Sequence, residues 1–251
     1  MSLPDIHRIH LTETGSTNSY ARALPTRRGV TLITTDHQTA GRGQRGNTWE
    51  SAAGKNLIFT FIVKPEGVPA TQQFALCELI SVALCDALAR YTTDIRIKWP
   101  NDIYYKNRKL CGILIEHDLE GMHLSRTIIG VGLNVNQAAF TSDAPNPVSL
   151  CQILGHEIER EVLLEEIVSH FMELYRQYTS PTPTLSRDIL HERYTSLLYR
   201  KDEEATYRNA DGIFTATLRT VELDGHLILE DLQGNNHSYL FKEVSYELYS
   251  E

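Results

Sequence analysis

The sequence predicts an α/β (α+β) fold, with a mixed β-sheet and flanking helices in residues 1–200 and a small β-barrel in residues 201–251. Strand-like apolar runs alternate with helix-period segments as far as Leu198. The charged run RKDEE at 200–204 then marks a boundary, beyond which short strands are separated by hairpin signals such as Asp-Gly. With 251 residues and 41% hydrophobic content, the chain can bury one large core and a small satellite domain.

The elements of the first part follow from the period of the apolar residues. Residues 19–24 form a short helix, capped by a hydroxyl or amide side chain of the preceding GSTN segment. A long helix with one apolar stripe is expected at 70–91, and Pro100 stops a strand that begins near Ile95. Further strands are expected at 7–11, 30–34, 57–63, 109–119 and 122–136, and further helices at 148–154, at 161–178 and in an apolar pattern reaching 198.

Composition and charge exclude several classes of protein. A net charge of −8 makes a nucleic-acid partner improbable, because such proteins normally carry a basic face. The N-terminal MSLPDIHRIHL lacks the apolar region of a signal peptide, and no run approaches the length of a membrane span. We therefore expect no membrane partner and a cytoplasmic protein.

The cysteines and histidines do not predict a disulfide scaffold or a metal centre. Cys77, Cys85, Cys111 and Cys151 have no C-x-x-C spacing and are expected to be free thiols. The segment Glu116-His117-Asp118 has the residue types of a metal site, but neighbours on a strand alternate in direction. It is interpreted as a solvated strand end.

The most informative segment is the polar, glycine-rich stretch DHQTAGRGQRGNTWESAAG at 36–54. Long structureless connections are uncommon inside compact domains unless they bind ligands or are disordered. The glycines allow a close approach of backbone to ligand, and Arg42 and Arg45 offer donor forks for carboxylate or phosphate. Trp49 adds a flat face that can cover a ring. The stretch is predicted to clamp an anion.

The letters GRGQRG at 41–46 also satisfy the G-x-G-x-x-G dinucleotide pattern. That pattern requires a glycine turn that opens directly into an apolar helix, whereas here NTWESAAGK and a strand-like run follow. A nicotinamide oxidoreductase is therefore disfavoured.

Three further segments join the glycine-rich stretch: GSTN at 15–18, KWPND at 98–102 and RKLCGILIE at 108–116. In this order and at these intervals, the chain resembles the biotin protein ligases (biotin-[acetyl-CoA-carboxylase] ligases) over most of residues 10–140. The resemblance implies a fold like that of these ligases and of class II aminoacyl-tRNA synthetases, with an SH3-like C-terminal barrel. It implies the short form of the family, without an N-terminal DNA-binding domain.

The resemblance also implies substrates, a partner and roles for individual residues. ATP and biotin are the expected substrates with Mg²⁺, and the partner is the biotin carboxyl carrier protein or domain of a biotin-dependent carboxylase. Residues matching those that read the ureido head of biotin are Ser16, Thr17, Asn18 and Gln38. Those matching the positions around its tail and carboxylate are Gly41, Arg42, Gly43, Gln44, Lys109 and Gly112. Those that fall where the family handles ATP are Arg45, Trp49, Lys98, Asn101, Asp102 and Asn134. The expected catalytic residues are Lys109, Arg42, Arg45 and Asp102, with Asp102 also the candidate Mg²⁺ ligand.

The chain departs from the family pattern at three places. Cys111 stands where alanine is usual, Asn47 where the residue is often basic, and the C-terminus lacks an arginine that some members contribute to the nucleotide site. Two alternatives stay open. A lipoate or octanoate protein ligase would have an apolar lining in place of the polar set, and a non-catalytic biotin sensor would need an effector domain. A homodimer formed through a sheet edge also stays open.

Overall fold

The large β-sheet is mixed, as the sequence predicts. The computed structural model describes residues 6–25, 27, 29–142 and 145–247, except for the side chain of Arg45. The sheet has seven strands in the order β1-β2-β3-β7-β6-β5-β4. The first pair is parallel and the others are antiparallel. The strands are β1 (Ile6–Thr14), β2 (Val30–Gln38), β3 (Leu57–Val63), β4 (Ile95–Lys98), β5 (Asp102–Tyr105), β6 (Arg108–Glu120) and β7 (His123–Leu133).

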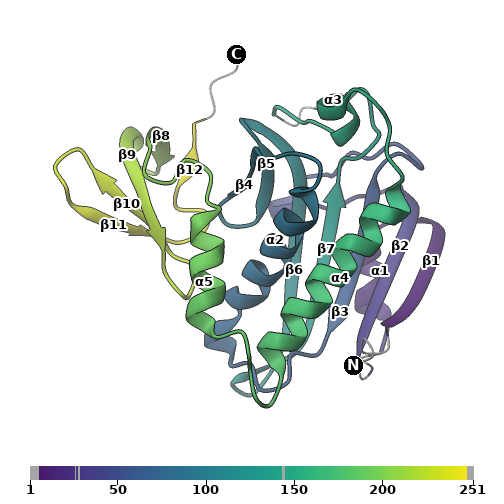
Figure 1. Cartoon of the computed structure of the whole chain (residues 1–251). Coiled ribbons are helices and arrows are strands. Elements are labelled where there is room, and N and C mark those ends of the chain that lie inside the picture. Colours follow the sequence, from purple (N-terminus) through teal and green to yellow (C-terminus); the bar gives the residue numbers. More distant parts are fainter. Residues whose placement is uncertain (1–5, 26, 28, 143–144, 248–251) are drawn as a thin grey trace.

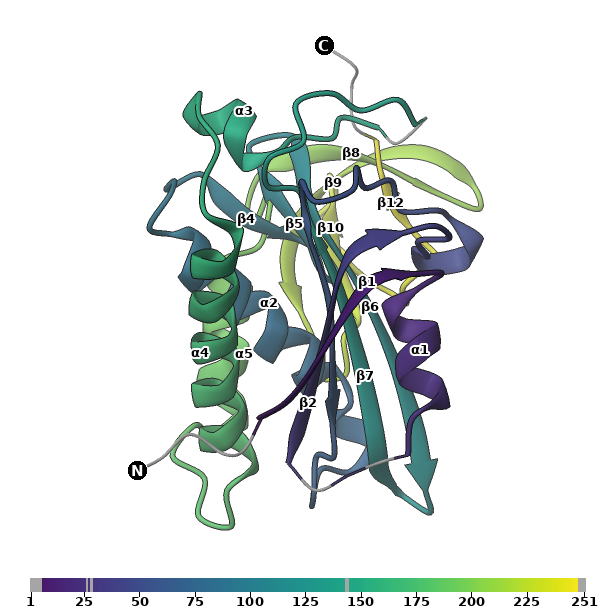
Figure 2. The ribbon, with the colours of Figure 1, turned by 90° about the vertical axis from the view of Figure 1, so that its right-hand side faces the viewer.

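Helices cover both faces of this sheet. The long helices α2 (Phe74–Leu88), α4 (Arg160–Thr179) and α5 (Arg187–Ser196) lie on one face, and α1 (Thr17–Ala23) lies on the other. Figure 2 shows this separation with the sheet seen nearly edge-on. A short helix, α3 (Leu150–Leu154), lies at the end of the sheet that is uppermost in Figure 1. The predicted alternation of strands and helices is confirmed.

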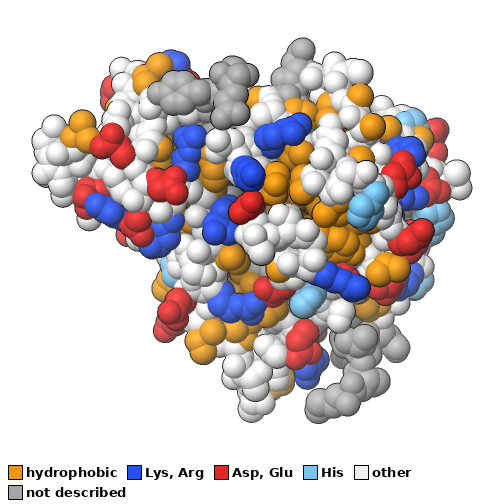
Figure 3. Space-filling view, turned by 45° about the horizontal axis from the view of Figure 1, so that its top comes forward, with side chains coloured by type: hydrophobic (Ala, Val, Ile, Leu, Met, Phe, Trp, Pro, Cys, Tyr) orange, Lys and Arg blue, Asp and Glu red, His pale blue; other side chains and the backbone are white. Residues whose placement is uncertain are grey.

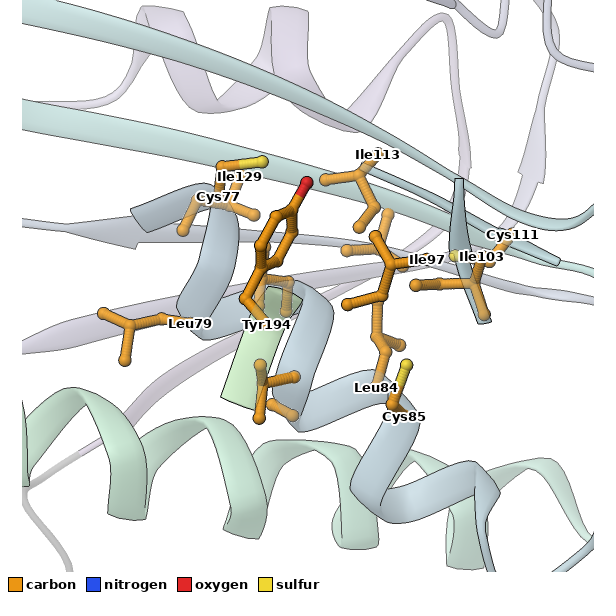
Figure 4. Packing of buried hydrophobic residues seen from close by; sticks show 14 of the residues in the cluster. Cys77, Leu79, Leu84, Cys85, Ile97, Ile103, Cys111, Ile113, Ile129 and Tyr194 are labelled. Carbon is orange, nitrogen blue, oxygen red and sulfur yellow. The ribbon is translucent and has the colours of Figure 1, made fainter. Parts of the chain in front are cut away.

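The main core lies between α2 and the sheet (Figure 4). The sequence predicts one buried stripe on this helix, but every residue of α2 except Asp86 is buried. The difference arises because α4 and α5 lie on either side of α2 and cover the parts of its surface that do not face the strands. Tyr194 of α5 is fully buried and extends into the same core.

The expectation that no apolar run approaches the length of a membrane span is wrong for α2 and the turn before it. The segment Ala70–Leu88 is long and apolar enough, by length and composition alone, to cross a membrane. About 72% of its most apolar window is buried inside the protein, as in the core helix of a globular fold. In the described residues it is the one helix that passes this test.

The other face of the sheet carries α1 and, next to it, the predicted binding residues. Ser16 caps α1, and its hydroxyl accepts a hydrogen bond from the Ser19 N–H at 3.5 Å. Ala21 packs on Ile33, Ile62 and Ile128 to form a small second core. The cap fixes the start of the helix, so Thr17 and Asn18 are held at the carboxyl end of β1.

The C-terminal part is a five-stranded antiparallel sheet in the order β11-β10-β9-β8-β12. Its strands are β8 (Glu204–Asn209), β9 (Gly212–Val221), β10 (Leu227–Asp231), β11 (Asn236–Tyr239) and β12 (Ser245–Tyr246). Hairpin signals fall between successive strands, at Asp211-Gly212, Asp224-Gly225 and Gly234-Asn235, and the sheet is consistent with the expected small β-barrel, although the barrel is not closed. In the described residues β11 and β12 do not pair with each other, so the sheet stays open.

Three strands and one turn differ from the sequence-based expectation. Strands β5, β8 and β12 were not predicted, because they are short and partly polar. The stretch at 36–54 is not structureless. Strand β2 continues to Gln38, and residues 41–49 fold back on themselves through the Trp49 N–H to Gly41 oxygen bond of 3.0 Å and a short 3₁₀ turn at Gln44–Gly46.

Candidate functional site

A cavity of about 730 Å³ opens on the face of the large sheet that carries α1. Its walls come from the start of α1, the 41–49 turn, the ends of β4 to β7 and the C-terminal segment 241–246. In the space-filling view of this end of the molecule, Lys and Arg side chains gather near the middle of the face, beside a band of hydrophobic side chains (Figure 3). The cavity therefore combines an apolar surface with charged groups.

One end of the cavity is lined by hydroxyl and amide groups. Gln38 Oε1 accepts hydrogen bonds from the Thr17 N–H at 2.8 Å and from the Thr17 hydroxyl at 3.1 Å. In the described part of the chain no hydrogen bond uses Gln38 Nε2, so this donor is available for a ligand. Thr60 Oγ1, on the fully buried strand β3, lies 2.8 Å from both Thr17 Oγ1 and Asn18 Oδ1. Since an amide oxygen only accepts, the Thr60 proton goes to Asn18, and Thr60 Oγ1 can then only accept from the Thr17 hydroxyl, which shares its single proton between Thr60 and Gln38. The network orients Thr17 and Asn18.

Asn18 and Arg42 share a carboxylate at the edge of this polar end. Asn18 Nδ2 donates to Glu116 Oε2 at 3.1 Å, and Arg22 donates to Glu116 Oε1 at 3.2 Å. The Arg42 guanidinium lies 3.8 Å from the same Oε1 atom. The interpretation of Glu116 as a solvated strand end is wrong, because its side chain is only 20% exposed and engaged by three partners.

Trp49 lies flat on the floor of the cavity, over two glycines of neighbouring strands. A methyl group at Gly132 would lie 2.5 Å from the indole nitrogen, and one at Gly112 would lie 2.8 Å from the ring. A methyl group at Gly130 would lie 2.1 Å from the Asn18 amide oxygen. The two glycines of β7, Gly130 and Gly132, therefore let the side chains of Asn18 and Trp49 approach the strand closely. Among the described residues, the buried Trp49 N–H has no partner and is a free donor.

The other end of the cavity is cationic. Lys109 Nζ lies 2.6 Å from Asp102 Oδ2 and 5.7 Å from the centre of the Trp49 ring. Lys98 sits beside this pair, since its strand partner in β4 and β5 is Asp102. Burial lowers the pKa of Lys98, with Asp102 opposing the shift. Gln44 joins this end by donating to Asn101 Oδ1 at 3.3 Å.

Most of the residues singled out by sequence meet in this one cavity. They are Ser16, Thr17, Asn18, Gln38, Arg42, Gly43, Gln44, Trp49, Lys98, Asn101, Asp102, Lys109 and Gly112, and Asn47 also lines it. Gly41 and Asn134 are absent from the described lining. Gly41 anchors the turn through Trp49, and buried Asn134 donates to the Val148 oxygen at 3.1 Å. The Arg45 side chain lies outside what the structure describes.

Sequence reasoning missed several residues of the site. Thr60 had a signal, because it is the single polar residue in the run LIFTFIV. Glu116 was considered and set aside, since its contacts come from residues almost one hundred positions away. Tyr104 and Tyr246 line the cavity but carried no recognisable motif.

The fold and the cavity define a class of protein. A mixed sheet presents a neutral hydrogen-bonding end and a cationic end in one cavity, together with the aromatic ring of Trp49. Such a site suits a ligand with a neutral polar head and an anionic tail that meets a second, phosphorylated ligand. The chain belongs to the Biotin/lipoate A/B protein ligase family, whose model matches residues 7–134.

Individual relatives agree with this assignment. The chain is 31% identical over 243 residues to the bifunctional ligase/repressor BirA of Bacillus spizizenii, covering 93% of this chain and 72% of that protein. It spans 64% of the Bacillus subtilis BirA, at 32% identity over 83% of this chain. It is 33% identical to a biotin--[acetyl-CoA-carboxylase] ligase of Paracoccus denitrificans, over 64% of this chain and 70% of that protein.

A solved structure supports the fold over nearly the whole length. The biotin protein ligase from Aquifex aeolicus, in complex with biotin and ATP, superposes with a TM-score of 0.78 at 24% identity. The match covers 97% of this chain and 99% of that one. The C-terminal sheet is therefore part of the shared architecture.

Proposed function

We propose that this protein is a ligase that attaches biotin to a lysine of a carrier domain in two ATP-dependent steps. The observation that carries the proposal is the single cavity in which Thr17 and Gln38 lie at one end and Lys109 and Lys98 at the other. A neutral urea head fits the hydroxyl and amide end, and a carboxylate fits the cationic end. The relatives named as biotin ligases support the choice of substrate.

In the first step the biotin carboxylate attacks the α-phosphorus of ATP. A new oxygen–phosphorus bond forms, the bond to the bridging oxygen breaks, and pyrophosphate leaves with that electron pair. Two anions approach each other only where cations offset their repulsion. The cavity lining supplies three cationic side chains for this role, those of Arg42, Lys98 and Lys109. The product is biotinyl-5′-AMP, a mixed anhydride.

Mg²⁺ is expected to accompany the nucleotide. In the described part of the chain, Asp102 uses only Oδ2, toward Lys109, so that Oδ1 can act as one ligand. No described cluster of three metal-binding side chains lies in the cavity, and phosphate oxygens and water would complete the shell, as is usual for this ion. When bound, Mg²⁺ would neutralise charge on the departing phosphates.

The glycine-rich turn is suited to protecting the anhydride from water. Its Arg42 side chain is half exposed and only loosely held, 3.4 Å from the Ser19 hydroxyl and 3.8 Å from Glu116. A guanidinium with such weak partners can leave them for a ligand carboxylate at little cost. We infer that the turn closes over the bound acyl group and excludes water.

In the second step the neutral amine of the carrier lysine attacks the acyl carbon. A carbon–nitrogen bond forms, AMP leaves with the carbon–oxygen electron pair, and the proton of the amine passes to base or water. Lys109 supplies a cation at this end of the cavity, and we assign it the role of stabilising the oxyanion. The carrier is a biotin carboxyl carrier domain, bound through a modest transient interface. We also propose that residues 1–200 form the catalytic domain. We propose in addition that the protein is located in the cytoplasm.

Biotin-dependent exchange of radiolabelled pyrophosphate into ATP tests the first step without any carrier. We expect exchange with biotin and Mg-ATP, and background exchange with lipoate, octanoate or no acid. Exchange that is supported by lipoate and not by biotin would contradict the proposal and leave the fold assignment intact.

A further inference from the structure

The ammonium group of Lys98 lies between two tyrosine rings that come from different sheets. Its Nζ atom is 5.4 Å from the ring centre of Tyr104 on β5 and 4.9 Å from that of Tyr246 on β12. Within the described ranges, no hydrogen bond or ion pair to a protein group holds this ammonium. All three residues line the cavity.

Tyr246 reaches this position from the last strand of the C-terminal sheet. Its backbone pairs with Tyr207 of β8, and its ring packs on the ring of Tyr207 at 5.1 Å and on that of Tyr199 at 6.0 Å. The residue is 9% exposed. Its buried hydroxyl has no hydrogen-bond partner in the part of the chain that is described. The aromatic ring is therefore the group through which Tyr246 contacts the Lys98 ammonium.

An aromatic face is a suitable neighbour for a cation that must also bind phosphate. A carboxylate beside Lys98 would compete with an anionic ligand, whereas a ring attracts the ammonium through its quadrupole and leaves the N–H donors free. Burial strengthens this attraction because little water screens it. The carboxylate of Asp102, the residue opposite Lys98 in the β4–β5 pair, is already bound by Lys109 at 2.6 Å.

We propose that Tyr246 is a positioning residue that, with Tyr104, holds the Lys98 ammonium toward the phosphates of ATP. This inference rests on the proposed function. Phe241 supports the same wall, since its ring packs edge-to-face on Trp99 at 5.7 Å.

The test compares Tyr246→Leu with Tyr246→Phe, and uses Tyr239→Leu as the matched control. Tyr239 belongs to the opposite edge of the same sheet, stacks on Phe214 at 6.0 Å and does not line the described cavity. Steady-state pyrophosphate exchange gives the KM for ATP and kcat, and calorimetry gives the Kd for biotin.

For Tyr246→Leu we expect the KM for ATP to rise about tenfold, with kcat and the biotin Kd changed less than about twofold. Tyr246→Phe should restore the wild-type KM, because only the ring is required. Tyr239→Leu should leave all three values unchanged. An unchanged KM in Tyr246→Leu, or an equal rise in Tyr246→Phe, would overturn the inference.

A second measurement separates this inference from the proposed function. Labelling of the folded protein with acetic anhydride, read by peptide mass spectrometry, reports the accessibility of the Lys98 amine. We expect Mg-ATP alone to slow Lys98 labelling at least fivefold in the wild type and in Tyr246→Phe, but not in Tyr246→Leu. If the wild type shows no biotin-dependent exchange, the proposed function has failed, and equal protection in all three proteins would still overturn the role of Tyr246.

Discussion

Lys109 Nζ and Asp102 Oδ2 lie 2.6 Å apart, at the end of the cavity where the biotin carboxylate and the nucleotide are proposed to meet. Both side chains are about three-quarters buried, at 27% and 24% exposure. A carboxylate that binds Lys109 therefore competes with Asp102 for the same ammonium. This competition ties the position of the acid substrate to the residue proposed to face Mg²⁺.

Asp102→Asn is expected to separate these two roles. Pyrophosphate exchange should fall about 10- to 100-fold and need more Mg²⁺ for half-maximal activity, as is typical when a group near a metal loses its charge. Biotin affinity should stay the same or increase, because Lys109 loses its competitor. Calorimetry and a Mg²⁺ titration measure the two effects. Weaker biotin binding in this variant would show that Asp102 does not compete with the ligand.

Gly132→Ala should act through Trp49. The added methyl group would fall 2.5 Å from the indole ring, so the ring must leave its place over the strands. We expect at least a tenfold loss in kcat/KM for ATP, with little loss in the double variant Gly132→Ala/Trp49→Ala beyond that of Trp49→Ala alone. Additive losses in this cycle would mean that the glycine serves another purpose.

Thr60→Val removes a hydroxyl that no ligand needs to touch. Asn18 Oδ1 then loses its donor inside a fully buried site, which costs about 1–3 kcal/mol for an unsatisfied group. We expect a biotin Kd about tenfold higher and a lower free energy of unfolding, measured by calorimetry and urea denaturation. Thr60→Ser keeps the hydroxyl and should recover most of the affinity. Equal losses in both variants would indicate a packing effect.

Glu78 joins the two parts of the chain and should be essential for stability. Its side chain is fully buried on α2 and pairs with Arg187 and, at 2.7 Å, with His191 of α5. His191 and Arg187 also donate to the Val221 and Leu223 oxygens near the β9–β10 turn, at 2.8 and 2.7 Å.

Glu78→Gln leaves a buried arginine without its counterion, at a cost of about 3–5 kcal/mol in the free energy of unfolding. Urea denaturation measures the loss. Glu173→Gln breaks the exposed pair with Arg176 on α4 and should cause no measurable change. Similar small effects in the two variants would show that the buried network contributes little.

The sequence predicted the parts of the fold that depend on local pattern. Strand β3 is a continuous apolar run, helix α4 has a clear helical period, and the helix cap at Ser16 follows a recognisable hydroxyl signal. Strands β5 and β12 have four and two residues, so that only their pairing partners make them strands. A local pattern cannot show that the C-terminal sheet stays open, because closure depends on edges that are far apart in sequence.

The same division holds for the site. Contiguous motifs such as GSTN and KWPND indicated residues that meet in one cavity. Other residues of the site contact partners that are far away in the sequence. Thr60 and Glu116 both bind Asn18, which is 42 and 98 positions away, and Tyr246 contacts Lys98. Such contacts are decided by strand order and sheet packing, which single motifs do not encode.

The most direct measurement is the mass of a biotin carboxyl carrier domain after incubation with this protein, biotin and Mg-ATP. The account predicts that the carrier gains the mass of one biotinyl group on one lysine. Lys109→Ala should slow this gain about 10²- to 10³-fold, because it removes a cation from the reacting centre. A carrier that stays unmodified while pyrophosphate forms, or one that is modified by lipoate in place of biotin, would contradict the central claim.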